Sequence, residues 1–141
     1  MARSGDGSSL AGLNVLLVED EYLIALDTDT MLIEAQVALV ITCSSCDSAL
    51  AALEETAFDI AILDVMLGVE RSEQVAEVLT ARGIPFVLAT GYPGKNQLGE
   101  AFIGAPIVSK PFGDVELRHA MVEALGRRKR ASDESGATDP V

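Results

Sequence analysis

Aromatic and basic side chains are scarce in this sequence of 141 residues. It has no tryptophan, two tyrosines and four phenylalanines, so it lacks the aromatic platform on which proteins stack single-stranded nucleic acids. Lysine and arginine number 10 against 22 aspartates and glutamates, a formal net charge of −12 at pH 7. Such a chain repels phosphate backbones and anionic membranes. We therefore expect no direct nucleic-acid binding, and we expect basic partners or divalent cations instead.

Long apolar runs and targeting signals are also missing. No uncharged apolar run approaches the roughly 18 residues that cross a bilayer, and the first ten residues lack the apolar stretch of a secretory signal. We expect a cytoplasmic protein with no membrane contact. The only two cysteines, Cys43 and Cys46, supply half of a zinc site and are interpreted as ordinary thiols in a reducing compartment.

Apolar runs alternate with helical stripes along the chain, in which 49% of the residues are hydrophobic. Near-continuous apolar runs predict buried strands, and a repeat of three to four residues predicts helices. The predicted strands are 13–18, 37–42, 58–63, 84–89 and 106–108. The predicted helices are 22–35, 48–56, 72–82 and 113–125, with Asp47 and Ser72 as caps of the second and third, and Gly83 ending the third. The glycine-rich segment 91–104 predicts at most a short or mobile helix.

Five successive strand–helix units predict one α/β domain with a parallel sheet covered on both faces. At this size the expected fold is a flavodoxin-like doubly wound sheet of five strands in the order 2-1-3-4-5. The domain is predicted to span residues 13–125, between a flexible leader at 1–12 and a disordered tail at 126–141. In such sheets the ligand site lies outside the carboxyl ends of the strands.

Acidic side chains gather at those ends. Glu19 and Asp20 follow the first predicted strand and Asp64 follows the third, whereas Thr90 and Lys110 follow the fourth and fifth. Three carboxylates in one place repel one another unless a cation accompanies them, and one lysine is too little. Mg²⁺ prefers oxygen ligands and lies beside phosphate in such sites. The sequence therefore predicts a magnesium site at this edge of the sheet.

At these residues the chain resembles the receiver domains of bacterial two-component response regulators (CheY-like domains), over about residues 13–125. Four motifs carry the resemblance, in order: Val18-Glu19-Asp20-Glu21, Ile62-Leu63-Asp64, Ala89-Thr90-Gly91 and Ser109-Lys110-Pro111-Phe112. Residues 85–92 further resemble a subgroup, often stand-alone proteins, with a Phe-Ala-Thr-Gly-like signature. Leu88 stands where the first phenylalanine of that signature would be.

The resemblance implies a role for each of these residues. Asp64 would be the phosphoacceptor, and Glu19, Asp20, Asp64 and the backbone carbonyl of Met66 would hold Mg²⁺. Lys110 would pair with the phosphoryl group and Thr90 would move to hydrogen-bond it. The resemblance also implies a cis Lys110–Pro111 bond, as in the family. The chain would assist its own phosphorylation and dephosphorylation without being an enzyme that turns over a substrate.

The switch residues depart from the pattern of the family. Ile107 stands three residues before the lysine, where most receivers carry Tyr or Phe. Tyr92 is one candidate replacement for the missing aromatic, and packing of Tyr92 against Ile107 is an equally good interpretation. Ordering of the segment 91–104 is a further hypothesis for the switch.

The resemblance implies a phosphorylation-switched signalling protein. Its partners would be a sensor histidine kinase or histidine phosphotransfer protein and an unknown downstream protein, contacted through the fourth strand (84–89), any helix in the segment 91–104 that follows it, and the fifth strand (106–108). The 16 residues after Leu125 leave no room for an output domain, and the chain would be a monomer or a phosphorylation-dependent dimer. The basic run from Arg127 to Arg130 is interpreted as a solvated helix end.

Two alternatives remain open. A degenerate receiver would bind partners without being phosphorylated, which Ile107 favours and the complete acidic set disfavours. A magnesium-dependent aspartyl-phosphate phosphatase would need a second acid two residues after Asp64, as general acid, and Met66 occupies that position.

Overall fold

Five parallel strands form the centre of the molecule. The structure, a computed structural model, describes residues 10–91 and 99–138, with side chains up to residue 127. The strands are β1 (Asn14–Val18), β2 (Leu39–Cys43), β3 (Ile60–Asp64), β6 (Phe86–Thr90) and β7 (Ile107–Ser109). They are ordered β2-β1-β3-β6-β7 and all pair in parallel. Counted along the chain, this is the order 2-1-3-4-5, so the predicted flavodoxin-like fold is confirmed.

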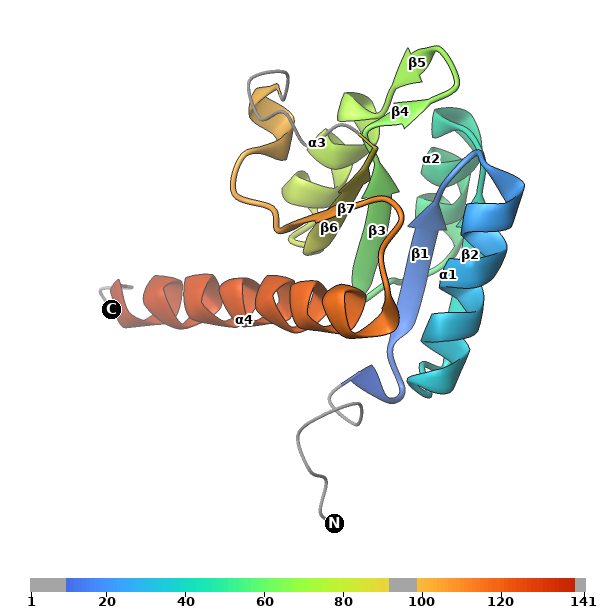
Figure 1. Ribbon diagram of the computed structural model, residues 1–141. Helices are drawn as coiled ribbons and strands as arrows, with labels where there is room; N and C mark the ends of the chain where they lie inside the picture. The colour runs from blue at the N-terminus through green and yellow to red at the C-terminus, as the bar shows by residue number, and fades with distance from the viewer. Residues whose placement is uncertain (1–9, 92–98, 139–141) are drawn as a thin grey trace.

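Helices cover both faces of the sheet (Figure 1). One face carries α1 (Tyr22–Glu34) and α4 (Asp114–Thr138), and the other carries α2 (Cys46–Glu55), α3 (Glu73–Ala81) and the short 3₁₀ helix η3 (Glu100–Phe102). Each face has its own apolar core, built from alternate residues of the same strands. Among the described residues, no helix combines the length and the apolar character that crossing a membrane requires.

Burial follows the position of each strand in the sheet. All five residues of β3 and all five of β6 are buried, because both strands are central and covered on both faces. The apolar run of β2 predicted a buried strand as well. β2 lies instead at the edge of the sheet, and only Cys43 of its five residues is buried.

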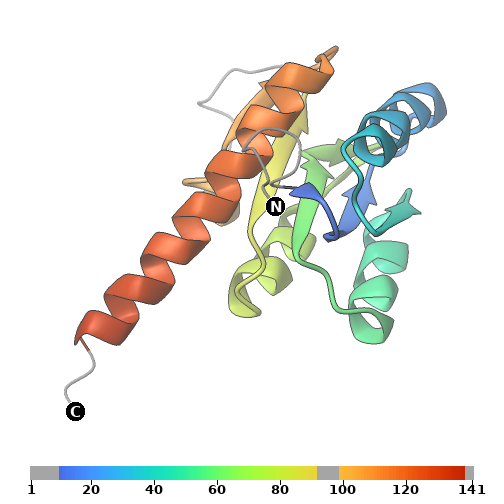
Figure 2. The ribbon, with the colours of Figure 1, turned by 90° about the horizontal axis from the view of Figure 1, so that it is seen from below.

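The structure corrects several predicted boundaries. Helix α2 begins at Cys46 because Ser45, not Asp47, is its N-cap and forms a capping box with Ser48. Leu10 is fully buried, so the core begins inside the segment predicted as a flexible leader. Helix α4 continues to Thr138, where a disordered tail was predicted from residue 126, and it extends beyond the sheet (Figure 2). Arg and Lys are good helix formers, and the two glycines of the extension, Gly126 and Gly136, cost only about 1 kcal/mol each.

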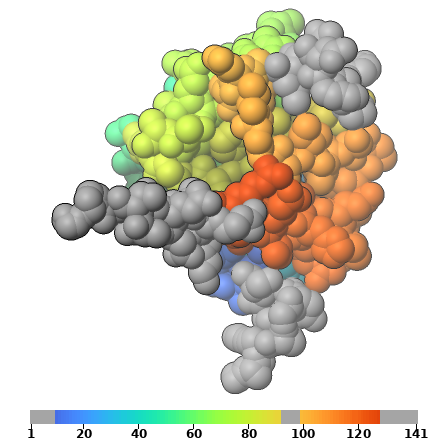
Figure 3. Space-filling view, turned by 90° about the vertical axis from the view of Figure 1, so that its left-hand side faces the viewer, coloured from blue at the N-terminus to red at the C-terminus, as the bar shows by residue number. Residues whose placement is uncertain are grey.

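Figure 3 shows the molecule from the side towards which α4 runs. The last described side chains of α4 emerge near the middle of this face, beside the orange residues of the β7 region and below the yellow-green residues of α3. Helix α4 therefore packs on the sheet through its first turns and then runs away from it. Its buried side chains are Leu117, Ala120, Met121 and Ala124, the four predicted to point inward.

A small hairpin, which the sequence analysis missed, separates β3 from α3. Its strands are β4 (Met66–Leu67) and β5 (Glu70–Arg71), and they pair antiparallel with Leu67 opposite Glu70. The two-residue loop begins at Gly68, which has a φ of 65°. Glycine at the first loop position is typical of the tight turns that join antiparallel strands. The hairpin is placed at the carboxyl end of β3, next to Asp64.

Gly83 ends α3 as the sequence predicted, and its replacement by alanine tests how much that turn depends on glycine. Its φ is 71°, and a Cβ added there would meet no atom within 4 Å. Gly83→Ala should lower the free energy of unfolding by about 1–2 kcal/mol through backbone strain alone. Gly91→Ala, at an exposed glycine with ordinary φ, should change it by less than about 0.5 kcal/mol. Equal effects in urea titrations would contradict this account of the turn.

Candidate functional site

The carboxyl ends of four strands bring together residues that are far apart in the sequence. Glu19 follows β1, Asp64 is the last residue of β3, and Thr90 is the last residue of β6. Lys110 follows β7, and its N–H donates to the carbonyl of Thr90 at 2.8 Å. Because the strands run in parallel, these residues meet at one edge of the sheet, below the hairpin in Figure 1.

Lys110 connects two buried carboxylates. Its Nζ donates to Asp64 Oδ2 at 2.8 Å and to Glu19 Oε1 at 3.1 Å. Only 11% of the Lys110 side chain is exposed, and the two carboxylate side chains are buried more deeply. Glu19 and Lys110 lie 91 residues apart in the sequence, so this contact exists only when the sheet is assembled in its observed order.

A third carboxylate, that of Asp20, completes the cluster. Glu19, Asp20 and Asp64 each offer an oxygen such that all three lie within 4.8 Å of one another. Asp20 is exposed, unlike the other two, and its Oδ2 lies beside Gly68 at the hairpin turn. The cluster is therefore open to solvent on the side of Asp20 and closed on the side of Lys110.

Burial and charge shift the proton equilibria of the cluster. Desolvation raises the pKa of Glu19 from 4.5 to about 7; the nearby charge of Asp64 adds to this, whereas the Glu21 N–H and Lys110 oppose it. Burial lowers the pKa of Lys110, but hydrogen bonds and charge from Asp64 and Glu19 outweigh it and raise the value. Lys110 therefore stays charged, and near neutral pH Glu19 is half protonated without a cation.

The donor set of the cluster fits a hard divalent cation. Three carboxylates face one ammonium group, so the fully ionised cluster keeps a negative charge that Lys110 does not balance. All available ligand atoms are oxygens, which Mg²⁺ prefers. Burial is the main cause of the raised pKa of Glu19, and the neighbouring negative charge of Asp64 adds to it.

The backbone of Met66 faces the cluster. Its N–H donates to Asp64 Oδ1 at 3.3 Å. Ser72 N–H donates to the carbonyl of Val65, so the next pair of the hairpin, Met66 and Arg71, is not hydrogen-bonded across the strands. The N–H and carbonyl of one extended residue point to the same side of a strand. The Met66 carbonyl is thus directed away from β5, on the side of Asp64.

Ile107, one of the predicted switch residues, is not part of the cluster. Ile107 lies on β7 opposite Leu88 and is 41% exposed. Tyr92 lies outside the described residues, as does the rest of 92–98, half of the segment 91–104, so its contact with Ile107 stays a prediction. Of that segment, residues 100–102 form the short helix η3 and place Phe102 in the core.

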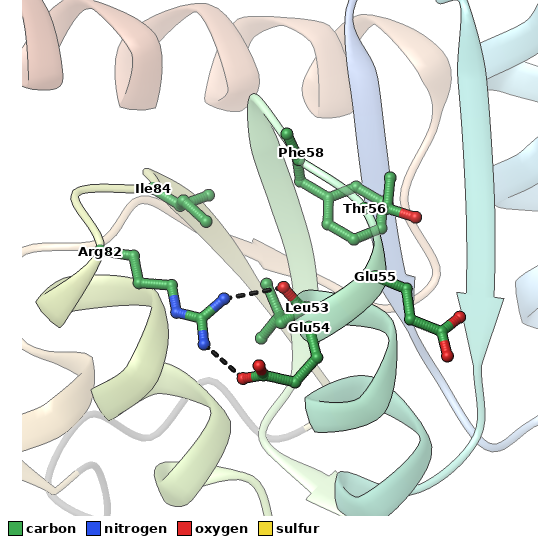
Figure 4. Close-up of a pocket in the computed structure, with 8 residues that line it drawn as sticks. Leu53, Glu54, Glu55, Thr56, Phe58, Arg82 and Ile84 are labelled. Atoms are coloured by element: carbon green, nitrogen blue, oxygen red, sulfur yellow. Dashed lines mark hydrogen bonds and ion pairs between the residues drawn. The ribbon is translucent and has the colours of Figure 1, made fainter.

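Other polar features lie away from the cluster. Cys43 and Cys46 are buried free thiols, and burial raises the pKa of both, as expected for ordinary thiols. A surface pocket lies at the opposite, amino end of β3 and β6 (Figure 4). The Arg82 guanidinium spans it with bonds to the Leu53 carbonyl and the Glu54 carboxylate. This pocket contains none of the predicted site residues.

Comparison with known proteins identifies the family. No family model and no curated protein matches the chain. Its structure is similar to the solution structure of SdrG from Sphingomonas melonis Fr1, with 36% identity over 84% of this chain and 97% of that one (TM-score 0.63). It is also similar to a response regulator receiver protein from Sinorhizobium medicae WSM419, with 26% identity, 83% and 97% coverage and a TM-score of 0.73. The fold and the acidic edge are those of a receiver domain. The chain belongs to the response regulator receiver (CheY-like) family.

A third similar structure carries a metal. The receiver domain of sensor histidine kinase PA1611 from Pseudomonas aeruginosa PAO1 has a magnesium ion coordinated in its active-site cleft. It shares the fold at 21% identity, covering 82% of this chain and 99% of that one, with a TM-score of 0.71. The acidic cluster described above is consistent with Mg²⁺. The Lys110–Pro111 bond is cis, as the family resemblance implied.

The pKa of Glu19 predicts how stability depends on pH without divalent ions. Between pH 4.5 and about 7 the folded chain holds a proton on Glu19 that the unfolded chain has lost. The free energy of unfolding should therefore fall as pH rises through this window, by up to about 1.4 kcal/mol per unit from this group. Glu19→Gln should remove this contribution and be more stable than the parent at pH 8.

The exposed neighbour Glu21 provides the control. Glu21→Gln should keep the pH profile of the parent chain in urea titrations at pH 5, 6, 7 and 8 in EDTA. If Glu19→Gln has the same profile as the parent, Glu19 does not carry the proton and this description of the cluster is wrong.

Proposed function

We propose that the chain is a phosphorylation-switched receiver whose phosphoacceptor is Asp64. The observation that carries the proposal is the position of Lys110 Nζ, 2.8 Å from Asp64 Oδ2, with Glu19 and Asp20 beside the same carboxylate. Membership of the receiver family supports a phosphoacceptor over an enzyme with turnover. Asp64 is the last residue of a fully buried strand, and this burial restricts the conformations of its side chain.

The chemistry proposed for Asp64 is nucleophilic attack. A carboxylate oxygen of Asp64 bonds to the phosphorus of a phosphohistidine on the donor protein, and the P–N bond breaks. The electron pair of that bond stays with the imidazole, which takes up a proton from water. The product is an aspartyl phosphate, an acyl phosphate that hydrolysis returns to the carboxylate.

Glu19, Asp20, Asp64 and the Met66 carbonyl are proposed to hold Mg²⁺. When bound, the ion would neutralise charge on the phosphoryl oxygens during in-line transfer. To serve as a ligand, Glu19 would release its proton to water, to which the cluster is open on the side of the exposed Asp20. The outward direction of the Met66 carbonyl supports its place in this set.

Lys110 and Thr90 are proposed to act after transfer. The Lys110 ammonium would exchange its bond to the Asp64 carboxylate for one to a phosphoryl oxygen. Thr90 is buried one residue beyond Ala89, the partner of Asp64 in the sheet, and would hydrogen-bond a second phosphoryl oxygen. Position 107 carries isoleucine instead of the usual aromatic residue. We propose that Tyr92, or ordering of the segment 91–104, transmits the movement of Thr90 to the surface instead.

The wider assignments rest on family membership. The phosphoryl donor is proposed to be a sensor histidine kinase or a histidine phosphotransfer protein, and the output a contact with another protein. A stand-alone receiver of the Phe-Ala-Thr-Gly-like subgroup in the cytoplasm fits the charge and the signature at residues 85–92. The proposal is compatible with a monomer and with a phosphorylation-dependent dimer.

Phosphorylation by a small donor tests the proposal. After incubation with acetyl phosphate and Mg²⁺, intact mass should increase by about 80 Da, the mass of one phosphoryl group on a carboxylate. Asp64→Asn should abolish the increase because the amide is not a nucleophile for phosphorus. Omission of Mg²⁺ should reduce it strongly.

Asp47→Asn, at an exposed aspartate in the first turn of α2, is the matched control and should be modified like the parent chain. A parent chain that gains no mass would favour the degenerate receiver. Modification that persists in Asp64→Asn would show that another residue is the acceptor. Steady turnover of a simple phosphomonoester would favour the phosphatase.

A further inference from the structure

Ser72 occupies the N-cap position of α3 but does not cap it. The backbone of Ser72 accepts the first bonds of the helix, from the N–H groups of Val75 and Ala76. No bond joins its side chain to the helix N-terminus. A serine at this position normally accepts a bond from the second or third N–H of the helix. The hydroxyl of Ser72 is therefore used elsewhere, in a residue that has no exposed surface at all.

The hydroxyl of Ser72 points back to the phosphoacceptor strand. It lies 2.6 Å from the carbonyl oxygen of Asp64 and 3.1 Å from that of Val65. The N–H of Ser72 donates to the same Val65 carbonyl at 3.0 Å. One residue thus holds two consecutive carbonyls at the point where β3 has ended.

The position of the Asp64 carbonyl shows why it needs this donor. Val65 donates its N–H to Ala89 of β6, so Asp64, one residue earlier, directs its carbonyl to the opposite side, towards β1. The ladder between β1 and β3 ends one residue earlier, at Val18 and Leu63. Among the residues that the structure describes, no strand partner bonds the Asp64 carbonyl there, and the Ser72 hydroxyl takes that place.

Closing this loop orients the groups that face the cluster. Residues 65 to 72 leave β3, form the hairpin and return to its end, so the bond from Ser72 to Asp64 fixes both ends of the hairpin. Within it, the Met66 N–H binds Asp64 Oδ1. On its far strand, Glu70 accepts the N–H of Cys46 at 3.1 Å and ties the hairpin to α2. Ser72 thus holds the backbone from which the Asp64 carboxylate and the Met66 carbonyl project.

We infer that Ser72 is a positioning residue of the phosphoacceptor site, which holds the Asp64 backbone and the hairpin so that their oxygens converge. The inference rests on the proposed function for its effect on phosphorylation, and on the hydrogen bonds alone for its effect on geometry. Removal of a residue that orients metal ligands without binding the metal itself typically lowers metal affinity or activity by about 10- to 100-fold. A serine that only stabilised α3 would lower stability and leave the folded site unchanged.

Two substitutions at Ser72 and one control separate these roles. Ser72→Ala removes the donor at nearly unchanged volume, and Ser72→Cys replaces it by a weak donor on a larger sulfur atom, so the two variants disturb packing differently and a second variant is available if one does not fold. Ser45→Ala removes a real N-cap hydroxyl from α2 that has no bond to the hairpin. All chains are compared below their unfolding temperatures, with stability measured in urea.

Amide exchange tests the geometric part without metal or phosphate. In the Ser72 variants the Met66 N–H should exchange about tenfold faster or more, since its acceptor is no longer held. Ser45→Ala should leave that rate unchanged. An unchanged Met66 rate in the Ser72 variants would overturn the inference.

Mg²⁺ affinity, measured calorimetrically, and the initial rate of acetyl phosphate labelling test the functional part. Both should fall by about 10- to 100-fold in the Ser72 variants and stay at the parent level in Ser45→Ala. Parent-like values in the Ser72 variants, or equal losses in Ser45→Ala, would overturn the role of Ser72. A parent chain that is never labelled would instead overturn the proposed function, and the exchange result would still decide whether Ser72 holds the hairpin.

Discussion

One ammonium group shared by two buried carboxylates is the interaction on which the candidate site depends. Lys110 reaches Asp64 and Glu19 across the carboxyl ends of the sheet, and all three side chains are almost closed to water. Buried charges are tolerated when they are paired, and removing one partner is costly. The pairing here is incomplete, because Asp20 adds a third carboxylate beside the other two. The remaining negative charge makes the cluster suitable for a divalent cation, whereas burial, with a smaller effect from the charge of Asp64, raises the pKa of Glu19.

Main-chain groups set the directions of these side chains. The Glu21 N–H binds Glu19 Oε2, and the Met66 N–H binds Asp64 Oδ1. The Lys110 N–H continues the pairing of β7 with β6 by binding the Thr90 carbonyl. Each carboxylate of the buried pair is thus held by a lysine on one side and by a backbone donor two residues further along its own chain on the other. The hairpin matters for this reason, since it supplies the donor for Asp64 and is itself closed by Ser72.

Hydrophobic periodicity was sufficient to predict the strands and the residues at their ends, and the sheet order followed as the commonest arrangement for an α/β domain of this size. Parallel central strands are unbroken apolar runs, and the residue that ends such a run is easy to identify, as Asp64 shows. The hairpin escaped notice because strands of two residues have no measurable period, although Gly68 offered a turn signal. The role of Ser72 was not visible either, because its place in the sequence suits a helix cap and its real acceptor, the Asp64 carbonyl, is set by tertiary structure. The helix past Leu125 was missed because its polar composition resembles that of a tail.

Calorimetric titration of the metal-free chain with Mg²⁺, at pH 8 and pH 6 in buffers of different ionisation enthalpy, tests the central claim most directly. The account predicts one ion per chain and release of a proton from Glu19 on binding near pH 6. It also predicts an affinity that falls by up to about tenfold per unit below pH 7, because proton and metal compete for one carboxylate. Asp20→Asn should weaken binding at both pH values. Absence of binding, or an affinity that neither pH nor Asp20→Asn alters, would contradict the assignment of Glu19, Asp20 and Asp64 as one cation site.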